Sequence, residues 1–321
     1  MQFFNFKSFF KYIVSLSLLV FLLAHLDFII LLEKAGSISV SLLFISLALI
    51  LCQIFFLNIR WHILLNIGAH NIPFKISGLI NIAGYLANIL FITSVGGIIV
   101  KSGLAVRHGL SLTQAAFATL LDRLMTLGAL IVLSALGLPF LQNSIDHKLL
   151  FMLTLTVTGV IAVVFLSFAI LHSGLLKSYI LSSRKRSRLV VTLNNYMKNY
   201  GSMMKAWSCS IVAQVCFVLC VYTLSLGIEY PGQNEHTLEF LALVPILALI
   251  SSLPISFGGW GVREGAFIYG LAFIGFPMES AFLLSIQVGL ITLVAPFLFG
   301  LYYLLWFDVK AFLLGKDIRS V

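Results

Sequence analysis

Long apolar runs are the feature that most constrains this chain. Six are long enough for an α-helix, which rises about 1.5 Å per residue, to cross a hydrocarbon core about 30 Å thick. They cover residues 12–32, 39–58, 115–140, 150–172, 206–228 and 279–307. Apolar residues make up 60% of the chain and charged residues only 10%, which leaves too little polar surface for a globule in water. The sequence therefore predicts an all-α polytopic membrane protein.

Two further apolar regions are interrupted by glycines. Residues 79–103 break at 94–97 (Ser-Val-Gly-Gly), and residues 240–275 break at 254–261 (Pro-Ile-Ser-Phe-Gly-Gly-Trp-Gly). The limbs beside each break hold about 15 residues or fewer, or about 22 Å of helix, which is short of a full crossing. We expect both regions to be re-entrant helical hairpins that return to the side from which they enter, in addition to the six full transmembrane helices.

The basic residues favour this topology. With both regions re-entrant and both termini in the cytoplasm, sixteen of the 20 Lys and Arg residues fall in cytoplasmic segments and two in outer loops, as the positive-inside rule requires. A basic cytoplasmic loop is expected at 173–205, and its run 182–188 (Ser-Ser-Arg-Lys-Arg-Ser-Arg) is expected to contact anionic lipid of the inner leaflet. The net charge of +9 therefore indicates membrane contact and no nucleic-acid partner.

The two breaks can be aligned with each other. Segments 94–103 and 256–265 share five of ten residues, and Lys101 aligns with Arg263. Each half of the chain then contains two spans, a hairpin and a third span, and because three crossings is an odd number the second half is inverted. The repeats cover about 12–140 and 150–307 of one membrane domain, 1–321. Inverted repeats with broken helices near the midplane are typical of transporters.

Each break offers a place for an anion. Irregular backbone at membrane depth has to line a cavity, and the helix that follows presents free N–H groups and the positive end of its dipole. Asp122 and Arg123 are adjacent, point about 100° apart on a helix and need separate partners. We expect Arg123 to hold a headgroup phosphate and Asp122 to steady Lys101 or Arg107, although a structural ion pair and simple close packing of the glycines stay open. The candidate ligand-binding residues are Ser94, Gly96, Gly97, Lys101, Arg107, Asp122, Arg123, Ser256, Gly258, Gly259, Gly261, Arg263 and Glu264.

With these residues in view, the chain resembles the flippase-like membrane domain that forms the N-terminal part of bacterial lysylphosphatidylglycerol synthases and also occurs as stand-alone proteins. The matching residues are Arg60-Trp61, 94–97 with Lys101, Asp122-Arg123 and 254–265, within a resemblance over about 12–307. It implies lipid translocation in a bacterial plasma membrane, without the soluble aminoacyl-transfer domain. Members often carry an acidic residue and an arginine where this chain has Ile98 and Lys101.

We therefore expect a flippase-like transporter that moves a phospholipid or a polyprenyl-phosphate-linked lipid with an anionic headgroup. Two alternatives stay open: a membrane enzyme or subunit that modifies an aminoacyl lipid or lipid-linked glycan, with Glu264 or Asp122 as its base, and an ion-coupled solute carrier. The sequence contains no P-loop, no Ser/His/Asp set and no metal-ligand spacing, so we expect no cofactor, no metal and no catalytic residue. It leaves the oligomeric state open.

Overall fold

The computed structural model describes residues 39–68, 71–90, 94–172, 184–228, 235–253 and 260–306, and this part of the chain is helical and contains no strand. Four helical segments in it are long and apolar enough to cross a membrane. They are α3 (Val40–Leu65), α6 (Leu112–Gly137) with the 3-10 turn η1 (Leu138–Leu141), α10 (Tyr200–Ser225) and α13 (Met278–Trp306).

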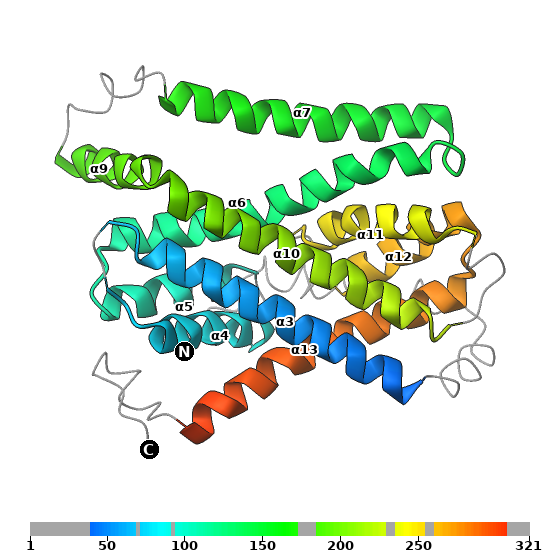
Figure 1. Cartoon of the computed structure of the whole chain (residues 1–321), viewed down its shortest axis with the longest axis horizontal. Helices are drawn as coiled ribbons and strands as arrows, with labels where there is room; N and C mark the ends of the chain where they lie inside the picture. The colour runs from blue at the N-terminus through cyan, green and yellow to red at the C-terminus, as the bar shows by residue number, and fades with distance from the viewer. Residues whose placement is uncertain are drawn as a thin grey trace, which may run out of the picture.

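A fifth long helix, α7 (His147–His172), occupies the predicted span 150–172 and lies along one edge of the bundle in Figure 1. The predicted span 12–32 falls outside the described residues. The segment 173–205 is more than a loop, because it contains the helix α9 (Arg184–Lys198) and α10 already begins at Tyr200. α9 opens with the basic run 184–188 and continues with Leu and Val at 189–191 and 193, followed by two asparagines.

The two interrupted regions form two pairs of shorter helices. The first pair is α4 (Phe74–Leu90) and α5 (Ser94–Arg107), and the second is α11 (Thr237–Ser251) and α12 (Val262–Leu271). The members of each pair pack against each other, and the two pairs lie toward opposite ends of the bundle (Figure 1). A second 3-10 segment, η2 (Ala272–Ile274), leads from α12 towards α13.

The antiparallel pair α3 and α10 forms the centre of the bundle. Their contacts run in opposite directions along the chain: Ser46 reaches the carbonyl of Cys220, Cys52 lies 3.8 Å from Cys216 (Sγ–Sγ), and Arg60 reaches Ser210. Small residues on α10 let the backbones approach, as is usual where helices pack inside a membrane. This pair joins the two halves of the chain.

Glycines bring other helices into close contact. A Cβ added to Gly137 of α6 would lie 2.9 Å from the Cα of Ala242 on α11, and one added to Gly128 would meet the ring of Trp207 on α10 at 2.6 Å. Outside the membrane helices, the buried hydroxyl of Tyr196 on α9 donates to the carbonyl of Leu64 at 2.8 Å. Burial raises the pKa of Tyr196, so this donor stays protonated and holds α9 against the end of α3.

Candidate functional site

A cavity of about 220 Å³ lies where α3, α4, α5, α6, α10 and α11 meet. Its walls come from both halves of the chain, and most of the intramembrane charges gather on them. The lining residues are Gln53, Leu57, Arg60, Gly84, Tyr85, Asn88, Gly97, Ile98, Lys101, Thr119, Asp122, Arg123, Thr126, Gln214, Phe217 and Ala248. Four of the predicted ligand-binding residues are among them: Gly97, Lys101, Asp122 and Arg123. Ile98, where family members often carry an acidic residue, also lines the cavity.

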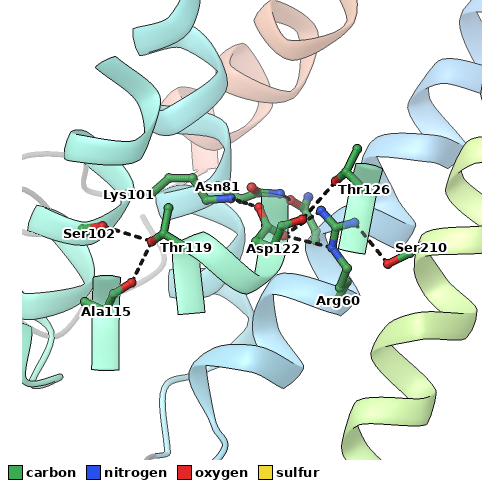
Figure 2. A network of polar contacts seen from close by, with 10 residues as sticks. Arg60, Asn81, Lys101, Ser102, Ala115, Thr119, Asp122, Thr126 and Ser210 are labelled. Carbon is green, nitrogen blue, oxygen red and sulfur yellow. Dashed lines mark hydrogen bonds and ion pairs between the residues drawn. The ribbon is translucent and has the colours of Figure 1, made fainter. Parts of the chain in front are cut away.

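Asp122 is the centre of a buried ion network (Figure 2). Its Oδ1 accepts from Nε of Arg60 at 2.9 Å and lies 2.6 Å from the Nη2 of the same guanidinium, while Oδ2 accepts from Nζ of Lys101 at 2.7 Å. The remaining terminal nitrogen of Arg60, Nη1, donates to Ser210 at 3.1 Å. The side chains of Arg60 and Lys101 are only 2% and 9% exposed, so one carboxylate neutralises one of two buried cations.

Asp122 and Arg123 have different partners, as expected from the step of about 100° between neighbouring residues of a helix. Asp122 faces α3 and α5, whereas Arg123 points towards α11 and its Nη2 donates to the carbonyl of Ser252, the residue that caps the C-terminus of that helix, at 3.1 Å. Unpaired carbonyls at a helix C-terminus attract cations. Within the described part of the chain, Arg123 forms no ion pair, although it lines the cavity.

Lys101 is held in place by three neighbours. Besides the ion pair with Asp122, its ammonium lies 3.9 Å from the ring centroid of the buried Trp61, which is a cation–π contact. A Cβ on Gly84 of α4 would overlap the Cγ of Lys101 and come within 2.6 Å of its Cδ. Gly84 therefore leaves the space through which the lysine side chain reaches Asp122.

The first glycine pair lies inside a helix, which corrects the predicted position of the break. α5 begins at Ser94 and includes Gly96 and Gly97, so residues 94–97 belong to its first turn and do not interrupt it. Gly97 is needed because a Cβ there would lie 2.5 Å from the carbonyl oxygen of Gly84. Its N–H donates to the Oδ1 of Asn88 at 2.8 Å, which satisfies one of the free N–H groups of the first turn of α5.

Arg60 is the site residue that sequence reasoning placed elsewhere. It was expected among the cytoplasmic charges just after the span 39–58, but α3 continues to Leu65 and buries it. A signal for this exists, because Leu57, Trp61 and Leu64 recur at a spacing of three or four residues and Arg60 lies on the same face. Arg107, by contrast, lies exposed at the end of α5 and does not line the cavity.

The second cation, Arg263, lies in a separate cluster at the start of α12. Its Nε and Nη2 donate to Oε1 of Glu264 at 3.0 and 2.5 Å, and its guanidinium lies 4.5 Å from the ring centroid of Trp260. The neighbouring residues do pair here, contrary to the 100° argument, because a first-turn Glu side chain turns back toward the helix N-terminus, where the long Arg side chain can reach it. A glycine again provides the space, since a Cβ on Gly289 would overlap the guanidinium.

Glu264 also closes the N-terminus of α12. It is fully buried, its Oε2 accepts from the N–H of Gly261 at 2.5 Å, and its Oε1 accepts from Ser285 at 3.3 Å. Gly261 has φ 85°, a left-handed conformation that favours glycine. The predicted ligands Ser256, Gly258 and Gly259 fall outside the described residues, and Arg263 does not line the cavity that contains Lys101.

No group of three His, Cys, Asp or Glu side chains that could hold a metal occurs among the described residues. The arrangement is instead suited to an anion, because the cavity walls carry three cations, Arg60, Lys101 and Arg123, and one carboxylate, Asp122.

A known protein family matches most of the chain. Residues 8–300 match the family described as the lysylphosphatidylglycerol synthase TM region. The chain belongs to this family. The family resemblance expected from the sequence is therefore confirmed, and it makes the chain a multi-pass membrane protein of lipid modification or translocation. A search of curated proteins finds no match.

Proposed function

We propose that this protein is a lipid translocase that moves a lipid with an anionic headgroup between the leaflets of a membrane. The observation that carries the proposal is the excess of positive charge in a cavity enclosed by apolar helices. Asp122 lies ten residues from the start of α6, about 15 Å along the helix axis, or about half of a 30 Å hydrocarbon core. Ionisable residues at such depth are costly and usually mark a pathway for a polar ligand.

Three features support a lipid rather than a free solute. Ile98 lines the cavity and is 41% exposed, so the cavity extends to the outer surface of the described bundle. Ile99, next to it on α5, and Leu120 and Leu124 of α6 are also exposed and apolar, as contact with acyl chains requires. The family is named for an enzyme of lipid chemistry. In this proposal the headgroup enters the cavity and the acyl chains stay in the bilayer.

We further propose the architecture of six full spans and two re-entrant hairpins in an inverted repeat. At about 22 Å and about 15 Å, α11 and α12 are too short to cross the membrane, and so is α5 at about 21 Å. The two hairpins lie toward opposite ends of the bundle (Figure 1). Gly97 at the start of α5 and Ala248 near the end of α11 nevertheless line the same cavity. Rocking of one repeat against the other would then expose the headgroup site to each side in turn.

The charge distribution supports an orientation for this architecture. Both termini and the basic segment that contains α9 would face the cytoplasm of a bacterial cell, where anionic inner-leaflet lipid would contact residues 182–188. We propose no covalent chemistry. Both oxygens of Asp122 accept from cations, and both oxygens of Glu264 accept from Arg263, Ser285 or Gly261, so neither carboxylate is placed as a base.

Leaflet exchange in proteoliposomes tests the proposal. Fluorescent phosphatidylglycerol is incorporated with wild-type protein, with Arg123→Gln and with Arg107→Gln, and the fraction open to dithionite reduction is followed over time. We expect exchange by wild type, a loss of at least tenfold in Arg123→Gln and no change in Arg107→Gln, because Arg123 lines the cavity and Arg107 does not. Equal exchange by the wild type and Arg123→Gln would contradict the proposed site, and exchange no faster than in protein-free vesicles would contradict the function.

A further inference from the structure

The net charge of the cavity walls predicts an order of preference among lipid headgroups. Arg60, Lys101 and Arg123 give three positive charges and Asp122 gives one negative charge, so the walls carry a net charge of +2. No other Asp or Glu among the described residues lines the cavity, and the other polar walls are neutral amides, hydroxyls and a phenol. Two charges therefore remain for a ligand to neutralise.

Asp122 is already paired with two cations. Its Oδ1 accepts from two nitrogens of Arg60 and its Oδ2 accepts from Lys101. A ligand ammonium would compete with these cations for the carboxylate, and a displaced buried cation would lose its partner. The other carboxylate at membrane depth, Glu264, does not line this cavity. The cavity therefore offers cations to a ligand but no free carboxylate.

Arg123 is the cation best placed to bind an anionic ligand. Its Nη2 donates to one carbonyl, that of Ser252, and within the described part of the chain no carboxylate pairs with it. A guanidinium has five N–H donors arranged to bind phosphate in a bidentate manner. The ammonium of Lys101 lies on the same cavity wall and can share the second charge of the ligand.

We propose that the cavity selects lipids by headgroup charge, with a preference for a doubly charged phosphomonoester or diphosphate over a phosphodiester and a rejection of headgroups that carry ammonium groups. This inference rests on the proposed function. A dianionic headgroup neutralises the walls, a phosphodiester leaves one positive charge, and a zwitterionic headgroup leaves two. Lysylphosphatidylglycerol, with one phosphate and two ammonium groups, would leave three. The lipid in the family's description is therefore the least favoured ligand for this cavity.

The experiment measures leaflet exchange of four fluorescent lipids with the same acyl chains: phosphatidic acid, phosphatidylglycerol, phosphatidylethanolamine and lysylphosphatidylglycerol. At pH 8 the phosphomonoester carries close to two charges, because its second pKa lies near 6–7. We expect exchange to fall in the order given, by at least tenfold between phosphatidic acid and phosphatidylethanolamine. Equal rates, or fastest exchange of lysylphosphatidylglycerol, would overturn charge selection and leave translocation intact. If no lipid moves, the proposed function fails, and lipid retention measured by native mass spectrometry then decides charge selection on the same scale.

Two variants at one position isolate the charge. Ile98→Glu adds one negative charge to the wall, whereas Ile98→Gln adds a side chain of nearly the same shape without it. We expect Ile98→Glu to shift the preference from phosphatidic acid to phosphatidylglycerol and Ile98→Gln to keep the wild-type order. The same order in both variants would overturn the proposal. Uptake of radiolabelled glycerol 3-phosphate into sealed vesicles separates the two sources of a phosphate: we expect none, and uptake that needs Arg123 would overturn a lipid ligand in favour of a free solute.

Discussion

Replacement of Asp122 by Asn is expected to destabilise the protein by about 3 kcal/mol. The carboxylate receives three charge-assisted contacts, from Nε and Nη2 of Arg60 at 2.9 and 2.6 Å and from Nζ of Lys101 at 2.7 Å. Such bonds contribute about 1.5–3 kcal/mol each, but the loss of one partner of a buried pair costs about 3–5 kcal/mol in total. Asn keeps one carbonyl oxygen for one of the cations, which places the expected cost at the lower end of that range.

A double-mutant cycle separates this charge effect from a general disturbance of α6. Lys101→Met removes the second cation, so Asp122→Asn should cost less in that background, by about 2 kcal/mol. The free energy of unfolding is measured by SDS titration in mixed micelles for the wild type, both single variants and the double variant. Asp146→Asn serves as the matched control, because Asp146 is exposed outside the bundle. Costs that add to within about 0.3 kcal/mol would refute the idea that Asp122 acts through the buried cations.

Two other substitutions test the packing around the site. Gly84→Ala should push the Lys101 side chain away from Asp122, with a cost of about 1–3 kcal/mol in unfolding and a reduction of lipid exchange of at least fivefold. Gly103→Ala, which also lies in a helix but has open space around it, should leave lipid exchange unchanged and stabilise the protein by up to about 1 kcal/mol through helix propensity. Equal behaviour of the two would argue against a positioned lysine. Oxidation by copper–phenanthroline should join Cys52 to Cys216, whose sulfurs are 3.8 Å apart, as detected by mass spectrometry of non-reduced peptides, and an uncrosslinked product would place α3 and α10 in another register.

The pairing of charges shows how much of the site can be predicted from the sequence. A step of about 100° per residue was enough to predict that Asp122 and Arg123 have different partners, and the structure places Asp122 against Lys101, 21 residues away. Two asparagines of α4 bond to other helices in the same way: Asn81 donates to the side chain of Asn58 on α3, and Asn88 accepts from the N–H of Gly97 on α5. These results follow from local geometry and from the cost of unpaired polar groups in lipid.

Other features depend on packing that the sequence does not encode locally. Hydropathy ended the second span at residue 58, because Arg60 is charged, but its ion pair with Asp122 lets α3 continue to Leu65. The sequence predicts a break at the glycine pair 96–97. In the structure both glycines lie within α5, and Gly97 allows α4 to approach closely. The separation of Arg263 from Lys101 could not be foreseen from an alignment of the two breaks, since it depends on which helix faces each hairpin.

The location of a bound phosphate tests the central claim most directly. The protein is reconstituted in nanodiscs that contain phosphatidic acid, and its structure is determined by electron cryo-microscopy. We predict headgroup density inside the cavity, with a phosphate oxygen within about 3 Å of an Arg123 nitrogen and the acyl chains leaving past Ile98. A cavity without a headgroup, in a particle whose surrounding lipid belt is well resolved, would contradict the claim.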